Sequence, residues 1–131
     1  MIYFDKVSKL YSNNSIALED VTFQIAPKEF VSIVGHSGAG KTTLLKMLIA
    51  EDRPSTGQVF FESLDVHQIP RAMLPKYRRK IGTVFQDFKL LPNKTAFENI
   101  AFAMEANGRS DEEISENVPQ ALALVDLDDK A

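Results

Sequence analysis

Short apolar runs separated by turn-forming residues fill the first part of the chain, and they predict β-strands. Residues 2–7 fit a strand, and residues 21–25 (Val-Thr-Phe-Gln-Ile) alternate apolar and polar positions, as a strand with one buried face does. Residues 30–34 are almost continuously apolar and stop at Gly35, which is typical of a parallel strand covered on both faces. Further strands are expected at residues 58–61 and, in a buried position, at residues 81–85.

A helix is predicted directly after the glycine-rich segment that follows residue 35. Apolar residues almost surround the helix formed by residues 42–50, so we expect it to be deeply buried. Residues 53–57 (Arg-Pro-Ser-Thr-Gly) then break the chain. A short helix is expected at residues 73–80, and its cluster of basic side chains is best explained as a solvated helix face.

Two capping boxes mark helix starts in the last third of the chain. In this motif the side chains of two residues three positions apart satisfy each other's backbone amides. The pairs are Thr95 with Glu98 and Ser110 with Glu113. We therefore expect helices at residues 96–106 and 111–125, the second kinked or restarted at Pro119. Together with the strands, these helices indicate an α/β fold.

Composition and charge narrow the class of protein. Hydrophobic residues make up 44% and charged residues 25% of the 131, which excludes a wholly disordered chain. No apolar run approaches the roughly 20 residues of a membrane span, and the absence of cysteine fits a reducing cytoplasm. Residues 1–109 carry 14 basic and 11 acidic side chains, whereas residues 110–131 carry one and seven. Nucleic-acid binding is not indicated, and the acidic end is expected to be a solvated helix and tail.

The glycine-rich segment matches the phosphate-loop motif G-x-x-x-x-G-K-[ST] without a departure. Its residues are Gly35, His36, Ser37, Gly38, Ala39, Gly40, Lys41 and Thr42. Glycines let successive backbone amides converge on phosphate oxygens, and the following helix adds its positive end. Lys41 can reach the β and γ phosphates, and the Thr42 hydroxyl can ligate Mg²⁺. A predicted strand before the loop and a predicted helix after it supply the context that the motif requires.

The residues beyond the loop distinguish between classes of nucleotide-binding protein. A GTPase is unsupported, because no D-x-x-G occurs and the only Asn-Lys pair, at Asn93, continues into Thr-Ala. Three segments instead resemble the ATP-binding-cassette (ABC) ATPases. These are Val84-Phe85-Gln86-Asp87, Leu90-Leu91-Pro92 and Thr95-Ala96-Phe97-Glu98-Asn99-Ile100. The resemblance implies an incomplete ABC-type domain with an antiparallel β edge, residues 1–91 forming its core and β subdomain and residues 92–131 the start of its helical subdomain.

The resemblance assigns roles to several residues. Gln86 would contact Mg²⁺ and the attacking water, and with Lys41 it would make up the catalytic residues present. Thr42 and Gln86 would be the metal ligands. Tyr11 matches the aromatic residue that stacks on adenine, although by itself it would more often be a packing residue. Thr43 would join the residues of the phosphate loop in binding ATP.

Other family features are absent from the sequence. It has no Leu-Ser-Gly-Gly segment, no apolar strand ending in Asp-Glu, and no later histidine; residues 121–126 are expected to be helical. We therefore expect residues 1–131 to hold ATP–Mg²⁺ without appreciable hydrolysis. The family's missing strand would lie between residues 30–34 and 81–85, so two unpaired edges are expected, and with them a marginal or self-associating fragment.

Residues 78–82 and 85–91 most closely resemble the cell-division branch of the family, with lipoprotein-releasing and macrolide-export ATPases as near relatives. A full-length protein of this kind would form a head-to-tail homodimer at the inner face of the cell membrane. It would bind an integral membrane subunit through the region Phe85–Pro92, where Phe88, Leu90 and Leu91 either await a partner or pack into the domain's own core. A transport ATPase and a non-catalytic nucleotide-binding fragment remain alternatives.

Overall fold

The computed structural model describes residues 1–12 and 14–127. The chain divides into two compact units, Met1–Ile81 and Gly82–Ala131, the second described as far as Leu127. Over these ranges, no helix combines the length and the apolar character that crossing a bilayer requires.

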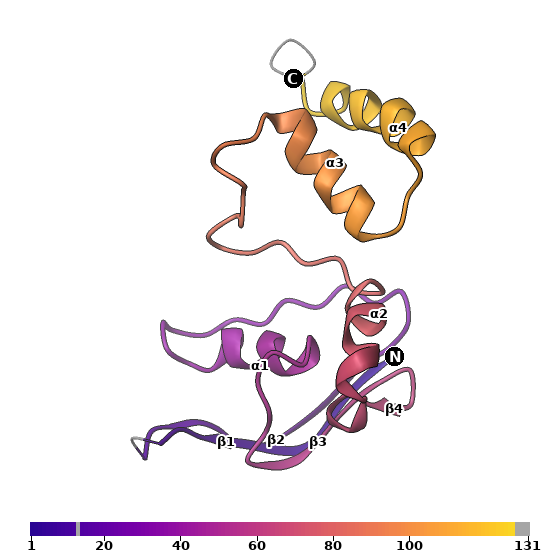
Figure 1. The fold of residues 1–131 in the computed structure, drawn as a ribbon. Coiled ribbons are helices and arrows are strands. Elements are labelled where there is room, and N and C mark those ends of the chain that lie inside the picture. Colours follow the sequence, from indigo (N-terminus) through magenta and orange to yellow (C-terminus); the bar gives the residue numbers. More distant parts are fainter. Residues whose placement is uncertain (13, 128–131) are drawn as a thin grey trace. The chain divides into compact units, whose positions relative to one another are not determined.

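The first unit is built on an antiparallel four-stranded sheet in the order β2-β1-β3-β4 (Figure 1). Its strands are β1 (Ile2–Leu10), β2 (Ile16–Ile25), β3 (Thr56–Phe61) and β4 (Leu64–Asp65). The strands predicted at residues 2–7, 21–25 and 58–61 are confirmed, and each extends beyond its expected start or end.

Helix α1 (Lys41–Leu48) covers one face of this sheet (Figure 1). Leu44 and Met47 of α1 pack in one cluster with Phe4, Val7 and Val59 of the strands. Burying each large apolar side chain contributes about 1.5–3 kcal/mol relative to leaving it in water. The position of α1 is therefore fixed by a core within the first unit.

The expectation that this helix is buried on nearly all sides is wrong. Thr43, Leu44 and Met47 are buried, but Leu45 is 54% exposed. The side of α1 that faces the sheet is covered, whereas Leu45, on another side, is left about half exposed by the described part of this unit. The sequence shows that an apolar residue lies on that side of the helix. It does not show whether another element packs against it.

Three short helical segments complete the first unit. They are the 3₁₀ turns η1 (Val66–Gln68) and η2 (Arg71–Met73) and helix α2 (Leu74–Arg78). Helix α2 confirms the short helix expected at residues 73–80. Its buried Tyr77 donates a hydrogen bond from the hydroxyl to the carbonyl oxygen of Leu48, at the end of α1.

Two predicted strands are absent from the described residues. Residues 30–34 and 81–85 form neither strand nor helix, and Phe30, Val34 and Val84 are 93%, 88% and 94% exposed. A strand is stable only when its backbone groups find a hydrogen-bonding partner, and no described strand pairs with either segment. The prediction that both are covered strands is therefore wrong here. The two unpaired strand edges expected at these positions are not present either, because neither segment is a strand.

The second unit contains an irregular segment followed by two helices, α3 (Ala96–Ala106) and α4 (Asp111–Ala123). Both predicted capping boxes are present: the Thr95 hydroxyl accepts from the Glu98 amide, and Ser110 and Glu113 form the same reciprocal pair. Helix α4 runs through Pro119 without restarting, so that part of the expectation is wrong. The first four residues of the 121–126 segment lie in or cap this helix, as expected, and the core of the pair consists of Ala101, Ile114, Val118 and Leu122.

Candidate nucleotide site

The turn that leads into α1 requires glycine for steric reasons. Gly38 and Gly40 have φ angles of +80° and +83°, in the left-handed region that L side chains rarely adopt. A Cβ at Gly40 would lie 2.4 Å from the Ala17 carbonyl oxygen and 2.7 Å from Leu18 Cδ2. The loop therefore packs directly against the backbone of β2, and only a residue without a side chain fits at Gly40.

The amino-terminal end of α1 has no side-chain cap. Gly40 is the capping residue, so no side chain accepts from the first backbone amides, and the first turn contains no acidic residue. Such an end carries unpaired N–H donors and the positive end of the helix dipole. An anion with several acceptor oxygens, such as a phosphate, is the ligand that this geometry favours.

Lys41 places a positive charge over the same loop. Its Nζ donates to the carbonyl oxygens of Gly35 and His36, each at 2.7 Å. The ammonium group is therefore held at the loop rather than extended into solvent. Phosphate oxygens accept from an ammonium group more strongly than neutral carbonyls do, so a bound phosphate can replace these contacts.

The remaining loop residues line the turn with polar groups. The Ala39 amide donates to the His36 carbonyl oxygen at 3.2 Å, and His36 Nδ1 lies 2.7 Å from the Ser37 carbonyl oxygen. Thr42 is exposed and Thr43 is buried. The exposed Thr42 hydroxyl is accessible to a cation bound beside phosphate oxygens, so the donor set fits the Mg²⁺ that accompanies a nucleoside triphosphate.

Tyr11 lies close to the start of α1. Its hydroxyl lies 3.1 Å from Asp52 Oδ2, to which it donates, and 3.4 Å from the Thr43 hydroxyl, while the residue remains 38% exposed. The structure thus brings Tyr11 into contact with Thr43, in the first turn of α1. Its side chain belongs to neither of the two buried core clusters.

Lys9 and Asp52 were not identified from the sequence. Lys9 Nζ and Asp52 Oδ1 are 2.5 Å apart, and the same ammonium lies 5.0 Å from the centre of the Tyr11 ring. No motif links a lysine in β1 to an aspartate after α1, since 43 residues separate them. Their proximity follows from the pairing of β1 with β3 and from the turn that precedes β3.

The Asp52 carboxylate is held in its ionised form. Burial alone would raise its pKa, but hydrogen bonds from the Lys9 ammonium, the Arg53 backbone amide and the Tyr11 hydroxyl lower the pKa below its usual range. At neutral pH the group is therefore a charged acceptor for both Lys9 and Tyr11.

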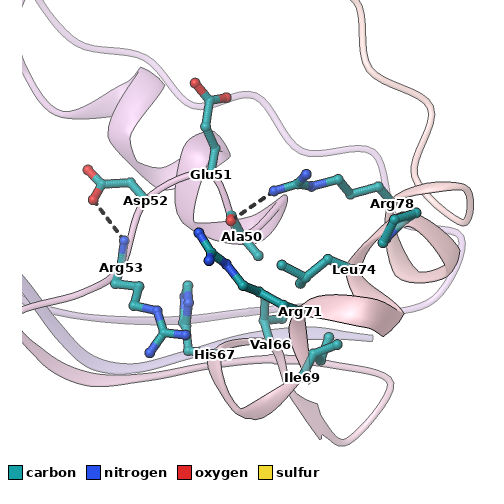
Figure 2. A pocket seen from close by; sticks show the side chains of 11 residues that line it. Ala50, Glu51, Asp52, Arg53, Val66, His67, Ile69, Arg71, Leu74 and Arg78 are labelled. Atoms are coloured by element: carbon teal, nitrogen blue, oxygen red, sulfur yellow. Dashed lines mark hydrogen bonds between the residues drawn. The ribbon is translucent and has the colours of Figure 1, made fainter.

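A pocket of about 810 Å³ lies at the opposite, carboxyl-terminal end of α1 (Figure 2). Arg78 donates from Nε to the Ile49 carbonyl oxygen at 2.8 Å and from Nη2 to that of Ala50 at 3.0 Å. Figure 2 also shows Arg53, Arg71 and His67 around this pocket. His67 is half-buried, and its buried Nε2 has no hydrogen-bond partner among the described residues.

Arginine at this end complements the negative end of the helix dipole. Burial lowers the pKa of His67, which favours its neutral form. None of the residues that line this pocket belongs to the phosphate loop, which lies at the other end of the same helix.

Gln86 belongs to the second unit. It lies in a segment, residues 82–92, that forms neither helix nor strand, and its side chain is exposed. Its role at the nucleotide stays a prediction. In the described part of the chain, no group of three or more His, Asp or Glu side chains is arranged to hold a metal ion.

Comparison with known sequences places this chain among characterised proteins. A family model described as ABC transporter matches residues 18–131. The cell division ATP-binding protein FtsE of Bacillus subtilis is 47% identical over 131 residues, and FtsE of Escherichia coli is 42% identical over the same length. Both matches cover the whole of this chain, but the chain spans only 58% and 59% of the length of these two relatives.

Solved structures give the same result. A dimeric, post-hydrolysis structure of the ATP-binding cassette MJ0796 bound to ADP and Pi matches 96% of this chain with a TM-score of 0.85 and 34% identity. A second dimeric structure of MJ0796, described as a bacterial ABC transporter cassette, matches with the same TM-score and 36% identity. Each match covers 57% of the known chain.

Proposed function

This chain belongs to the ABC transporter family of ATP-binding cassettes, and from that premise we propose that residues 35–43 bind the phosphates of ATP–Mg²⁺. The observation that carries the proposal is the uncapped start of α1, with the Lys41 ammonium held over the loop by two carbonyl oxygens. Steric exclusion of any side chain at Gly40 supports it, because the loop backbone must approach both β2 and the ligand closely.

Each site residue has a proposed role in this arrangement. The loop from Gly35 to Gly40 offers main-chain amides, Lys41 neutralises the β and γ phosphates, and Thr42 ligates Mg²⁺, with Thr43 completing the loop. Tyr11 stacks on adenine, a contact worth about 1–3 kcal/mol. Gln86 orients the attacking water and contacts Mg²⁺ as a neutral amide.

For the whole protein we propose ATP hydrolysis by a head-to-tail homodimer in an FtsE–FtsX-like complex that acts in bacterial cell division. Identity of 40–47% to relatives named FtsE supports this choice over lipoprotein release or macrolide export. The two dimeric cassette structures support the dimer. Such a complex would hold the protein at the inner face of the membrane, with residues 1–91 in the core and β subdomain and residues 92–131 beginning the helical subdomain.

The segment Phe85–Pro92 is proposed to contact the membrane subunit. Phe88 is 74% exposed and Leu90 is 67% exposed, while Leu91 is partly buried. Large apolar side chains exposed next to one another in one segment are typical of an interaction surface. This exposure supports docking over the alternative that these residues pack into the core of the second unit.

The proposal is tested by titrating the full-length protein and its Lys41→Ala variant with ATP–Mg²⁺. We expect the wild type to bind ATP–Mg²⁺ and the variant to bind it roughly ten- to a hundredfold more weakly. Equal affinity of the two proteins would contradict the proposal. Residues 1–131 alone are proposed to bind without appreciable hydrolysis, because they lack the family's apolar strand ending in Asp-Glu, and with it a carboxylate positioned to polarise the attacking water. Multiple-turnover phosphate release by this fragment, abolished by Lys41→Ala, would overturn that part.

A further inference from the structure

The ion pair between Lys9 and Asp52 differs from the other ion pairs of the described residues. Its side chains are 13% and 23% exposed, whereas those of the other pairs are 43–63% exposed. Exposed pairs contribute little because water and salt screen them. A pair that is mostly removed from water and also hydrogen-bonds a third side chain restricts the geometry of that side chain, here Tyr11.

We propose that Lys9 and Asp52 are positioning residues that orient the Tyr11 ring before a nucleotide base binds to it. Both act through Tyr11, and neither is proposed to touch the nucleotide. The inference deepens the proposed function and rests on it, since it assumes that Tyr11 and the phosphate loop form one nucleotide site.

The two oxygens of Asp52 accept from different side chains, and Oδ1 also accepts from the Arg53 backbone amide at 2.8 Å. Oδ2 accepts from the Tyr11 hydroxyl at 3.1 Å, and Oδ1 accepts from the Lys9 ammonium at 2.5 Å. Lys9 also donates to the Arg53 carbonyl oxygen at 2.8 Å. The end of β1 is therefore joined to the turn after α1 through Lys9 and through Tyr11 itself, and the phenol ring is held at its hydroxyl end.

The same contacts determine which face of the ring remains available. The Lys9 ammonium lies over one face of Tyr11, 5.0 Å from its centre, a distance at which a cation is attracted by the aromatic ring. A planar base is therefore expected to stack on the opposite face. The ligand class follows from this geometry: a flat, neutral aromatic ring attached to a phosphate chain.

Thr43 relates the ring to the phosphate loop. Its hydroxyl lies 3.4 Å from the Tyr11 hydroxyl, and its position in α1 is two residues after Lys41. Fixing Tyr11 at Thr43 and Asp52 therefore fixes the separation between the base-stacking ring and the phosphate-binding amides. A ligand that carries both groups gains from this preorganisation, whereas a ligand with phosphates alone does not.

That difference gives a selective test on the full-length protein. Two Mg²⁺ complexes serve as probes: ATP, and inorganic tripolyphosphate, which has no base. We expect Asp52→Asn and Lys9→Met each to weaken ATP about three- to tenfold and to leave tripolyphosphate unchanged. Glu51→Gln is the matched control, because Glu51 neighbours Asp52 and its contact with Lys46 is 3.9 Å long and exposed.

A double-mutant cycle separates positioning from a general structural role. In a Tyr11→Ala background, Asp52→Asn is expected to have no further effect on ATP affinity. Unchanged ATP affinity in both single variants would overturn the proposal. Equal loss of ATP and tripolyphosphate would overturn it as well, since Asp52 would then support the fold rather than Tyr11. Failure of the wild type to bind either probe would instead contradict the proposed function.

Discussion

The phosphate loop and the segment that carries Gln86 are organised in opposite ways. Residues 35–43 make their own geometry: glycine φ angles set the turn, Lys41 bonds to carbonyls of the same loop, and α1 packs on the sheet. Residues 82–92 form no strand or helix, and Gln86 and Phe88 are exposed. A site that uses its own backbone as a partner forms locally, whereas a site residue at the end of a strand depends on the strands beside it.

The largest expected effect tests whether the loop geometry is required. Gly40→Ala would place a Cβ 2.4 Å from the Ala17 carbonyl oxygen, and its φ of +83° adds about 1–2 kcal/mol of strain. We expect ATP affinity to fall by about a hundredfold or more and the melting temperature to drop. Gly82→Ala in the other region is the control, because its Cβ would meet no atom within 4 Å. A similar loss of ATP affinity in both variants would show that binding does not depend on the geometry of the loop.

The second expected effect isolates the charge at the loop. Lys41→Ala should cost about 1.5–3 kcal/mol, or roughly ten- to a hundredfold in ATP affinity, through the loss of one charged contact. Isothermal titration with ATP–Mg²⁺ measures it. Lys46→Ala is the control on the same helix, because the Lys46 side chain is exposed and its ion pair with Glu51 is long, at 3.9 Å. An affinity that falls equally in the two variants would point to general electrostatics instead of the loop.

The third prediction concerns the other region alone. Phe88→Asp should weaken association with the membrane subunit by about thirtyfold, the loss typical of an apolar residue at the centre of an interface. Nucleotide affinity should stay unchanged, because Phe88 lies outside the phosphate loop. Co-purification and titration measure the two quantities. Phe102→Asp, at a 55% exposed position of α3, is the control; equal loss from both variants would argue against a specific docking segment.

The smallest expected effect concerns the anchoring of α1. Tyr77→Phe removes the hydrogen bond to the Leu48 carbonyl oxygen and should lower the free energy of unfolding by about 0.5–1.5 kcal/mol. Burial raises the pKa of Tyr77 to about 12. Its contribution is therefore fully present below the unfolded pKa of about 10 and is lost as pH rises through 12. Urea unfolding between pH 9 and 12 measures the free energy of unfolding at each pH. We expect this free energy to fall less steeply with pH in the variant than in the wild type, and an identical pH dependence would contradict the assignment.

The two regions also differ in how far the sequence alone predicts them. The bounds of α3 and both capping boxes were predicted correctly, because Thr95 and Ser110 act on amides three residues away. The phosphate loop is equally local. Residues 30–34 and 81–85 were predicted to be strands and are not, because an apolar pattern reports a preference for burial and not the presence of a pairing partner. Lys9 and Asp52 escaped prediction since only the folded sheet brings them together.

The central proposal is that main-chain amides of the phosphate loop, within residues 35–43, bind the phosphates of ATP. Amide chemical shifts of the ¹⁵N-labelled full-length protein, followed during a titration with ATP–Mg²⁺, test it most directly. We expect the largest shifts at Gly38, Gly40 and Lys41, and in Lys41→Ala we expect the same titration to require a roughly ten- to hundredfold higher ATP concentration. Unchanged loop amides, or shifts centred on Arg53, Arg71 and Arg78 at the other end of α1, would contradict it.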